Sequence, residues 1–187
     1  LHDNNVYGLT KNQTSPTSKR GRKTNTHPRG AWLEPLDPIQ TTLSIPNASF
    51  VAQTIDWNPV HLLATLKAAH RHPGLSFVRI MQRCPHYPSD FVEVLQKEPS
   101  LVLLLTHPEG IEVDDAVKRM FKSQQEHDAA DLVGARALAD RRDVLPIGLF
   151  YRRESADRYD LISIEGLATA RNEKLAAIHA ELGRYEI

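Results

Sequence analysis

Between residues 37 and 81 the apolar positions switch between helical and strand spacing. Asp37-Pro38 and Asn58-Pro59 each place a side-chain acceptor before a proline, which predicts a helix start at both points. Residues 49–55 alternate and residues 75–81 are short and apolar, which predicts two strands. The order helix, strand, helix, strand favours parallel pairing, so we expect an α/β fold with a mostly parallel sheet.

The second of these helices has the most regular pattern in the chain. Its apolar stripe consists of Val60, Leu62, Leu63, Leu66 and Ala69, and Pro73-Gly74 ends it. Later segments are less informative. Their spacing predicts short helices at 91–98, 114–125 and 129–140, a strand-length apolar run at 101–105, an extended segment at 146–151, and a charged helix at 165–182.

Composition is that of a globular protein, with 41% hydrophobic and 25% charged residues and a formal net charge of zero. No apolar run approaches the roughly 18 residues of a membrane span. We therefore expect a cytoplasmic protein. One cysteine excludes an internal disulfide framework.

The first residues carry the candidate chemistry. A strand should end near His2 and Asp3, because amide, hydroxyl and proline residues follow up to Thr17. Loops at the carboxyl ends of parallel strands commonly hold ligands. The Asn4 side-chain oxygen and the Val6 backbone oxygen, two residues apart, would make half of a site for a hard cation such as Mg²⁺.

The segment Asn4-Asn5-Val6-Tyr7-Gly8-Leu9-Thr10 resembles the end of the thiamine-diphosphate motif in β subunits of 2-oxoacid:ferredoxin oxidoreductases. In that family a Gly-Asp-Gly precedes it by about thirty residues, so we interpret this chain as the C-terminal part of a longer subunit. The resemblance continues through 13, 15–17, 48–52, 55–57, 76–78 and 81–85, and resumes at 127–128 and 145–150.

The resemblance implies a three-layer thiamine-diphosphate-binding fold, present in part, with a helical and extended C-terminal tail. Residues 1–98 would be the C-terminal part of the cofactor domain, and residues 99–187 a family-specific region. Two departures from the family pattern are Asn12 and Asn47, where glycine is expected. Asn tolerates left-handed backbone better than other non-glycine residues, so the loop path need not change.

The resemblance also implies roles for the first loop. Asn4 and Val6 would hold Mg²⁺ with side-chain and backbone oxygens. The diphosphate loop would be lined by Tyr7, Gly8, Leu9 and Thr10, and Lys11 would meet an anion, either diphosphate or a substrate carboxylate. The carboxylate that activates the aminopyrimidine comes from the α subunit in this family, so no catalytic residue is expected in this chain.

Cys84 follows the strand at 75–81 in a stiff Arg83-Cys84-Pro85 segment. The resemblance makes it one of four ligands of a [4Fe-4S] cluster, with the other three outside this chain. Two alternatives stay open on the residues alone. A lone cysteine can be a small buried hydrophobe, and His70, His72, Cys84 and His86 supply four zinc-type donors, although their spacing is unusual for zinc. Glu126-His127-Asp128 looks like a catalytic trio, but Asp128 is better explained as the cap of the helix at 129–140.

Residues 11–29 form a basic loop with no acidic residue. Three interpretations fit such a run: a solvated loop, a nucleic-acid-binding surface, or a loop over the active site that meets an anionic cofactor or acyl carrier. Position favours the third. Aromatic residues, which single-strand binders normally add, are absent from the run.

The expected function is that of a subunit that oxidatively decarboxylates a 2-oxoacid, 2-oxoglutarate being favoured, and transfers the acyl group to coenzyme A. Electrons would pass through the [4Fe-4S] cluster to ferredoxin. The implied partners are the α subunit and ferredoxin. Two rival functions are a cluster-free thiamine-diphosphate decarboxylase or synthase, and a non-catalytic module that binds nucleic acid through the basic loop.

Overall fold

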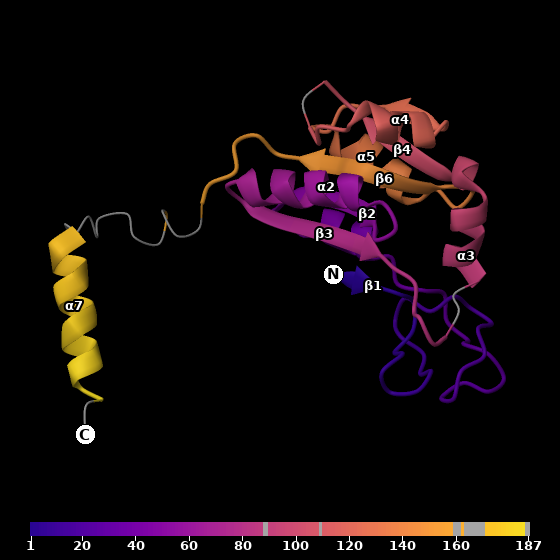
Figure 1. Cartoon of the computed structure of the whole chain (residues 1–187), viewed down its shortest axis with the longest axis horizontal. Helices are drawn as coiled ribbons and strands as arrows, with labels where there is room; N and C mark the ends of the chain where they lie inside the picture. The colour runs from indigo at the N-terminus through magenta and orange to yellow at the C-terminus, as the bar shows by residue number, and fades with distance from the viewer. Residues whose placement is uncertain (88–89, 109, 159–161, 163–170, 186–187) are drawn as a thin grey trace. The chain divides into compact units, whose positions relative to one another are not determined.

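The computed structural model describes residues 1–87, 90–108, 110–158, 162 and 171–185 (Figure 1). Contacts divide the chain into two compact units, Leu1–Ala156 and Asp157–Ile187. The elements of the first unit are β1 (His2–Asp3), α1 (Pro38–Leu43), β2 (Ala48–Ile55), α2 (Pro59–Arg71), β3 (Leu75–Met81), α3 (Asp90–Lys97), a 3₁₀ turn (Pro99–Leu101), β4 (Val102–Thr106), α4 (Asp115–Met120), β5 (Gln124–Glu126), α5 (Leu132–Ala139) and β6 (Leu145–Arg152). In the second unit, the described part contains α7 (Arg171–Gly183).

Six strands form one sheet in the order β1-β3-β2-β6-β4-β5. All neighbours are parallel except β2 and β6, which run antiparallel. The mostly parallel sheet predicted from the sequence is therefore confirmed. The antiparallel position of β6 beside β2, in the middle of the sheet, was not predicted.

Helices cover both faces of the sheet, and alternate residues of β2 separate the two cores. Phe50 and Ala52 pack on one face with alanines of α2, whereas Val51 packs on the other face with residues of α1 and α5. Every residue of β2 is buried. The sheet thus has helices on both faces, the architecture expected of an α/β domain.

Both predicted helix starts are present. The Asp37 carboxylate accepts from the Ile39 and Gln40 backbone nitrogens, and the Asn58 side-chain oxygen accepts from the His61 nitrogen at 3.0 Å. Each cap is followed by proline at the first helical position. The two signatures therefore act as predicted.

The face that α2 turns to the sheet differs from the stripe expected from its sequence. Its fully buried residues are His61 and Thr65, with Ala64, Ala68 and Ala69 packed beside them. Three large apolar residues of the expected stripe are exposed instead, namely Val60, Leu63 and Leu66. Small residues let the helix approach the sheet closely. Thr54 Oγ1 hydrogen-bonds His61 Nδ1 at 2.8 Å, whereas His61 Nε2 is buried with no hydrogen-bond partner among the described residues.

Two helices predicted in the second half are shorter than expected. The helix expected at 114–125 ends at Met120, because Phe121 takes an extended conformation and is buried, and the chain then adds β5 to the sheet. The helix expected at 129–140 begins at Leu132 and its cap is Asp131. The Asp128 carboxylate instead accepts from Ala130 N in the preceding turn, so its assignment as the helix cap was wrong.

The sheet continues across residue 98, because β4, β5 and β6 join the same sheet as β2. The division at residue 98 as the start of a family-specific region stays a prediction. In the C-terminal unit α7 overlaps the helix expected at 165–182, of which 165–170 lie outside the described residues. Among the described residues no helix has the length and apolar character needed to cross a membrane.

Candidate functional site

A buried ion pair lies where β1 and β3 end. The Asp3 Oδ2 accepts from Arg79 Nη2 at 2.6 Å and from Arg79 Nε at 2.9 Å, and both side chains are at most 10% exposed. Arg79 Nη1 donates to Gln53 Oε1 at 3.2 Å, and Gln53 Nε2 donates to the Pro146 carbonyl at 2.7 Å. This chain of bonds ties β1, β3, β2 and β6 together beneath the first loop.

Asp3 also organises the loop that follows it. Its Oδ1 accepts from Thr17 Oγ1 at 2.6 Å and from Asn5 N at 3.0 Å. Ser18 Oγ donates to the Asn5 carbonyl at 2.7 Å, and Asn5 Nδ2 donates to the Thr17 carbonyl at 2.9 Å. The two ends of the loop are therefore bound to each other, and the Asp3 oxygens are occupied by protein donors.

The two residues expected to hold Mg²⁺ lie against one another in one turn. Asn4 Oδ1 accepts from Val6 N at 3.2 Å, and Val6 is buried. An amide oxygen has two lone pairs, so Asn4 keeps one for a cation. A second acceptor in the same loop, Asn5 Oδ1, is buried and has no hydrogen-bond partner among the residues that the structure describes. Free oxygen acceptors of this kind fit a hard cation.

Residues 7–13 form a tight hairpin. Tyr7 N donates to the Gln13 carbonyl at 2.9 Å, Gln13 N donates back at 3.1 Å, and Lys11 N donates to the Gly8 carbonyl at 3.0 Å. Lys11 and Asn12 both have positive φ, of 64° and 62°. Asn12 thus has the left-handed backbone for which asparagine is suited in place of glycine. Leu9, at the tip, is 100% exposed.

The hairpin packs against Cys84. A Cβ atom added to Gly8 would lie 2.8 Å from Cys84 Sγ and 3.9 Å from the Tyr87 ring. Cys84 is buried and is not in a disulfide. Two predicted sites that are about 75 residues apart in sequence, the diphosphate loop and the cluster ligand, therefore touch. Only glycine allows the thiol to approach the loop backbone so closely.

The four zinc-type donors do not converge. His72 Nε2 bonds Ser49 Oγ at 2.8 Å near the start of β3, whereas Cys84 lies beyond the other end of that strand. Among the residues that the structure describes, no three His, Cys, Asp or Glu side chains are placed to hold a metal ion together. The zinc interpretation was wrong. A [4Fe-4S] cluster would need three further ligands from outside this chain.

Sequence reasoning missed three residues of this region, namely Asp3, Arg79 and Asp56. Asp56 follows β2, and its backbone nitrogen donates to the Met81 carbonyl at 2.9 Å. Burial raises the pKa of the Asp56 carboxyl, and the nearby Arg83 guanidinium opposes that rise. The sequence did contain a signal for the ion pair, because Arg79 is the one charged residue of the strand at 75–81. A charge buried in a sheet needs a partner of opposite charge.

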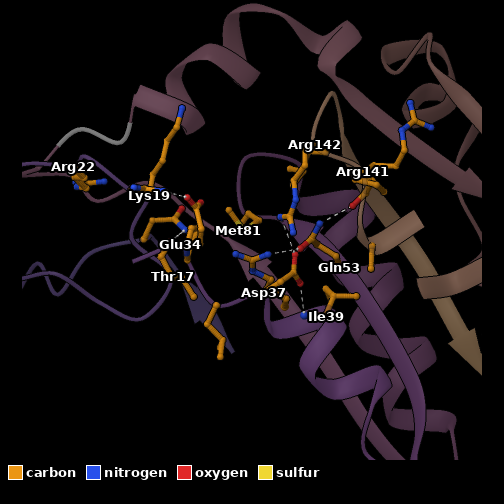
Figure 2. Close-up of a pocket in the computed structure, with 18 of the residues that line it drawn as sticks. Thr17, Lys19, Arg22, Glu34, Asp37, Ile39, Gln53, Met81, Arg141 and Arg142 are labelled. Atoms are coloured by element: carbon orange, nitrogen blue, oxygen red, sulfur yellow. Dashed lines mark hydrogen bonds and ion pairs between the residues drawn. The ribbon is translucent and has the colours of Figure 1, made fainter. Parts of the chain in front are cut away.

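A cavity of about 1150 Å³ lies between the basic loop and the start of β6 (Figure 2). In Figure 2 Lys19 and Arg22 lie on one side and Arg141 and Arg142 on the other. Seven cationic and two acidic side chains line it. They are Lys19, Arg20, Arg22, Lys23, Arg79, Arg141, Arg142, Glu34 and Asp37. Four of the seven cations are paired with carboxylates, namely Arg20, Arg79, Arg141 and Arg142. The exposed Lys19 and Lys23 are left to attract anionic groups to the cavity.

Comparisons with known proteins point to one family. No protein-family model matches the chain. A 2-oxoacid:ferredoxin oxidoreductase subunit β from Sulfolobus sp is 32% identical over 169 residues, covering 86% of this chain and 50% of the relative. The 2-oxoglutarate oxidoreductase subunit KorB of Mycobacterium tuberculosis is 36% identical over 113 residues, covering 59% of this chain and 30% of the relative.

The fold comparison agrees with the sequence comparison. The structure of a 2-oxoglutarate:ferredoxin oxidoreductase from Magnetococcus marinus, with 2-oxoglutarate, coenzyme A and succinyl-CoA bound, matches with a TM-score of 0.67 and 27% identity. The match covers 95% of this chain and 56% of that one. This chain spans about half the length of the first curated relatives it matches.

Proposed function

Because the chain is homologous to the β subunits of 2-oxoacid:ferredoxin oxidoreductases, we propose that it forms part of an enzyme that oxidatively decarboxylates a 2-oxoacid and passes the acyl group to coenzyme A and the electrons to ferredoxin. The observation that carries the proposal is the contact between Gly8 and Cys84. It brings a candidate diphosphate loop and a candidate cluster ligand to the same end of the sheet.

The proposed roles of the residues follow from their chemistry. Asn4 and Val6 would hold Mg²⁺ through a side-chain and a backbone oxygen, and Tyr7, Gly8, Leu9 and Thr10 would line the diphosphate. Lys11 meets an anion at the edge of the hairpin. Thiamine diphosphate, when bound, supplies the electron sink for loss of carbon dioxide, and a [4Fe-4S] cluster supplies one-electron transfer.

The protein also positions the groups that would bind the cofactors. The Asp3–Arg79 pair is fully used in holding the loop, so it positions Asn4 and Val6 without contributing a metal ligand. Cys84, which Gly8 approaches closely, would supply one of the four ligands of the cluster. Coenzyme A, the α subunit and ferredoxin complete the proposed system. The α subunit would supply the carboxylate that acts on the aminopyrimidine.

We favour 2-oxoglutarate as the substrate, because KorB relatives and the Magnetococcus structure are named for it. The test uses the complete subunit assembled with its α subunit. We expect 2-oxoglutarate to drive coenzyme A-dependent reduction of ferredoxin, and expect pyruvate to be slower. The reaction should require both Mg²⁺ and thiamine diphosphate.

The same assay separates the rival functions. A cluster-free thiamine-diphosphate enzyme would release carbon dioxide at an undiminished rate in Cys84→Ala and would contain no iron. A nucleic-acid-binding module would show no 2-oxoacid turnover, and its binding of an oligonucleotide would ignore Asn4→Ala. Either result would contradict the proposal.

A further inference from the structure

The segment Lys19–Lys23 carries four cations in five residues, namely Lys19, Arg20, Arg22 and Lys23. Its backbone has a defined path. Gly21 N donates to the Ala31 carbonyl at 2.8 Å, and Ala31 N donates to the Arg22 carbonyl at 2.9 Å. Gly30 packs so closely that an added Cβ would lie 2.8 Å from the Gly21 carbonyl oxygen. The four cationic side chains therefore project from a loop whose backbone is held in place by hydrogen bonds and close packing.

An exposed tryptophan continues this surface. Trp32 follows Ala31, the residue that binds the backbone of the cationic segment, and is 73% exposed. Its ring meets the His27 ring edge-on, with centroids 5.1 Å apart. Tryptophan and arginine are the residues that most often dominate protein–protein binding energy. We define the docking surface as Lys19, Arg20, Arg22, Lys23 and Trp32.

Much of the charge on the docking surface is available to a partner. Lys19 and Lys23 are exposed and form no ion pair within the described part of the chain. Arg20 pairs with Glu34 at 3.0 Å, but the two side chains are 65% and 74% exposed. Such exposed pairs contribute little energy and exchange readily with other partners. The surface thus attracts acidic groups.

The cationic residues of the docking surface line the same cavity as Tyr87, a neighbour of the hairpin that contacts Cys84. Tyr87 lines the same cavity as Lys19 and Lys23. The Tyr87 ring also lies 3.9 Å from the Cβ position of Gly8, which in turn is 2.8 Å from Cys84 Sγ. One aromatic side chain therefore connects the cationic surface with the neighbourhood of the thiol. A protein bound there would sit beside the candidate cluster ligand.

We propose that the docking surface receives the electron acceptor, a small protein with an acidic surface around its own redox centre. This inference rests on the proposed function, because the proposed reaction passes electrons to such a partner. Complementary charge steers the encounter and makes the association sensitive to salt. Trp32 supplies an apolar contact on the same surface.

The test measures binding of an oxidised acidic ferredoxin to the assembled enzyme by calorimetry, at low and at high salt. We expect Lys19→Glu/Lys23→Glu to weaken binding by about tenfold or more at low salt, because two attractive charges become repulsive. The loss should shrink at high salt. Trp32→Ala should weaken binding at both salt concentrations.

The matched control is Lys67→Glu/Lys122→Glu, which changes net charge equally at two exposed lysines outside the docking surface. It should bind ferredoxin like the wild type. Equal losses in the two double variants, or no loss in Lys19→Glu/Lys23→Glu, would overturn the proposal. Circular dichroism checks that each variant folds, and Lys19→Gln/Lys23→Gln provides a milder version with a smaller expected loss.

Two further measurements separate the possible failures. The iron content of the wild type tests the proposed function independently: iron-free enzyme that still binds ferredoxin at this surface would contradict the cluster but not the docking surface. A single-stranded oligonucleotide serves as the competing probe. If Lys19→Glu/Lys23→Glu abolishes its binding and leaves ferredoxin binding unchanged, the surface recognises nucleic acid and the proposal is overturned.

Discussion

Asp3 and Arg79 form a buried ion pair in which the guanidinium donates twice to one carboxylate oxygen, at 2.6 and 2.9 Å. The other oxygen of Asp3 binds Asn5 N and Thr17 Oγ1. Arg79 belongs to β3 and Asp3 to β1, so the pair joins the edge of the sheet to the first loop. The loop that carries Asn4 and Val6 is therefore anchored through Asp3 to a residue 76 positions further along the chain.

Arg79→Met tests this dependence. It leaves the Asp3 carboxylate buried without its cation, which we expect to lower the free energy of unfolding by about 3–5 kcal/mol. Urea unfolding measures the change. Arg20→Met is the matched control, since its pair with Glu34 is exposed and should contribute about 1 kcal/mol or less. Equal losses in the free energy of unfolding would show that the buried pair stabilises the fold no more than the exposed pair does.

Asn4→Ala in the complete subunit should weaken Mg²⁺ and thiamine diphosphate together. The substitution removes an oxygen from a metal site that tolerates little distortion, and we expect a loss of about tenfold or more in cofactor affinity. Calorimetric titration of thiamine diphosphate with Mg²⁺ and with a chelator measures it. Asn172→Ala, on the exposed face of α7, should titrate like the wild type. An unchanged titration of Asn4→Ala would remove this residue from the site.

Cys84→Ala in the complete subunit should reduce iron content and abolish ferredoxin reduction, yet leave thiamine-diphosphate binding largely in place. Iron analysis and cofactor titration on the same sample separate the two effects. The 187-residue chain has one cysteine, and we expect it to purify colourless by itself, since a cluster takes four ligands. Full iron content in Cys84→Ala would make this thiol a structural residue only.

Gly8→Ala should also lower the iron content, because it disturbs the contact between the hairpin and Cys84. The added methyl would lie 2.8 Å from Cys84 Sγ, so the thiol must move or the hairpin must shift. We expect lower iron content with the cysteine still present. Gly183→Ala is the control, because no atom of the described residues lies within 4 Å of the Cβ added there. If Gly8→Ala retains both iron and cofactor affinity, the contact has no functional role.

Stability should fall in mild acid because of two histidines. Burial lowers the pKa of His61 from 6.5 to about 4, and the pKa of His107 likewise to about 4, with the nearby His127 as a smaller cause. The folded state therefore binds fewer protons than the unfolded state. Their contribution is complete above pH 6.5 and is lost as the pH falls toward 4.

Denaturant unfolding between pH 7 and pH 4 measures this loss. We expect about 3 kcal/mol from His61, since each tenfold preference for the neutral ring contributes about 1.4 kcal/mol. His61→Gln should make the pH dependence smaller, leaving the part that comes from His107, while lowering stability at pH 7. His70→Gln, at an exposed position of the same helix, should leave the profile unchanged. A wild-type profile that is flat from pH 7 to pH 4 would contradict the prediction.

The sequence by itself determined the features that depend on neighbouring residues. Asp37 and Asn58 cap the helices that follow them, because a capping side chain reaches only two or three residues along the chain. The strands β2 and β3 and their parallel pairing followed from short apolar runs joined by a helix. The motif from Asn4 to Thr10 indicated the family, and the Asn4–Val6 turn is likewise local.

Only the tertiary structure decided which residues meet over long distances. Nothing in the spacing of α2 shows that it turns alanines, Thr65 and His61 to the sheet and leaves Leu63 exposed, because close approach to the sheet prefers small residues. The end of α4 depends on the burial of Phe121. The contact of Gly8 with Cys84 likewise arises from the sheet, since pairing of β1 with β3 brings the segments after the two strands to one end.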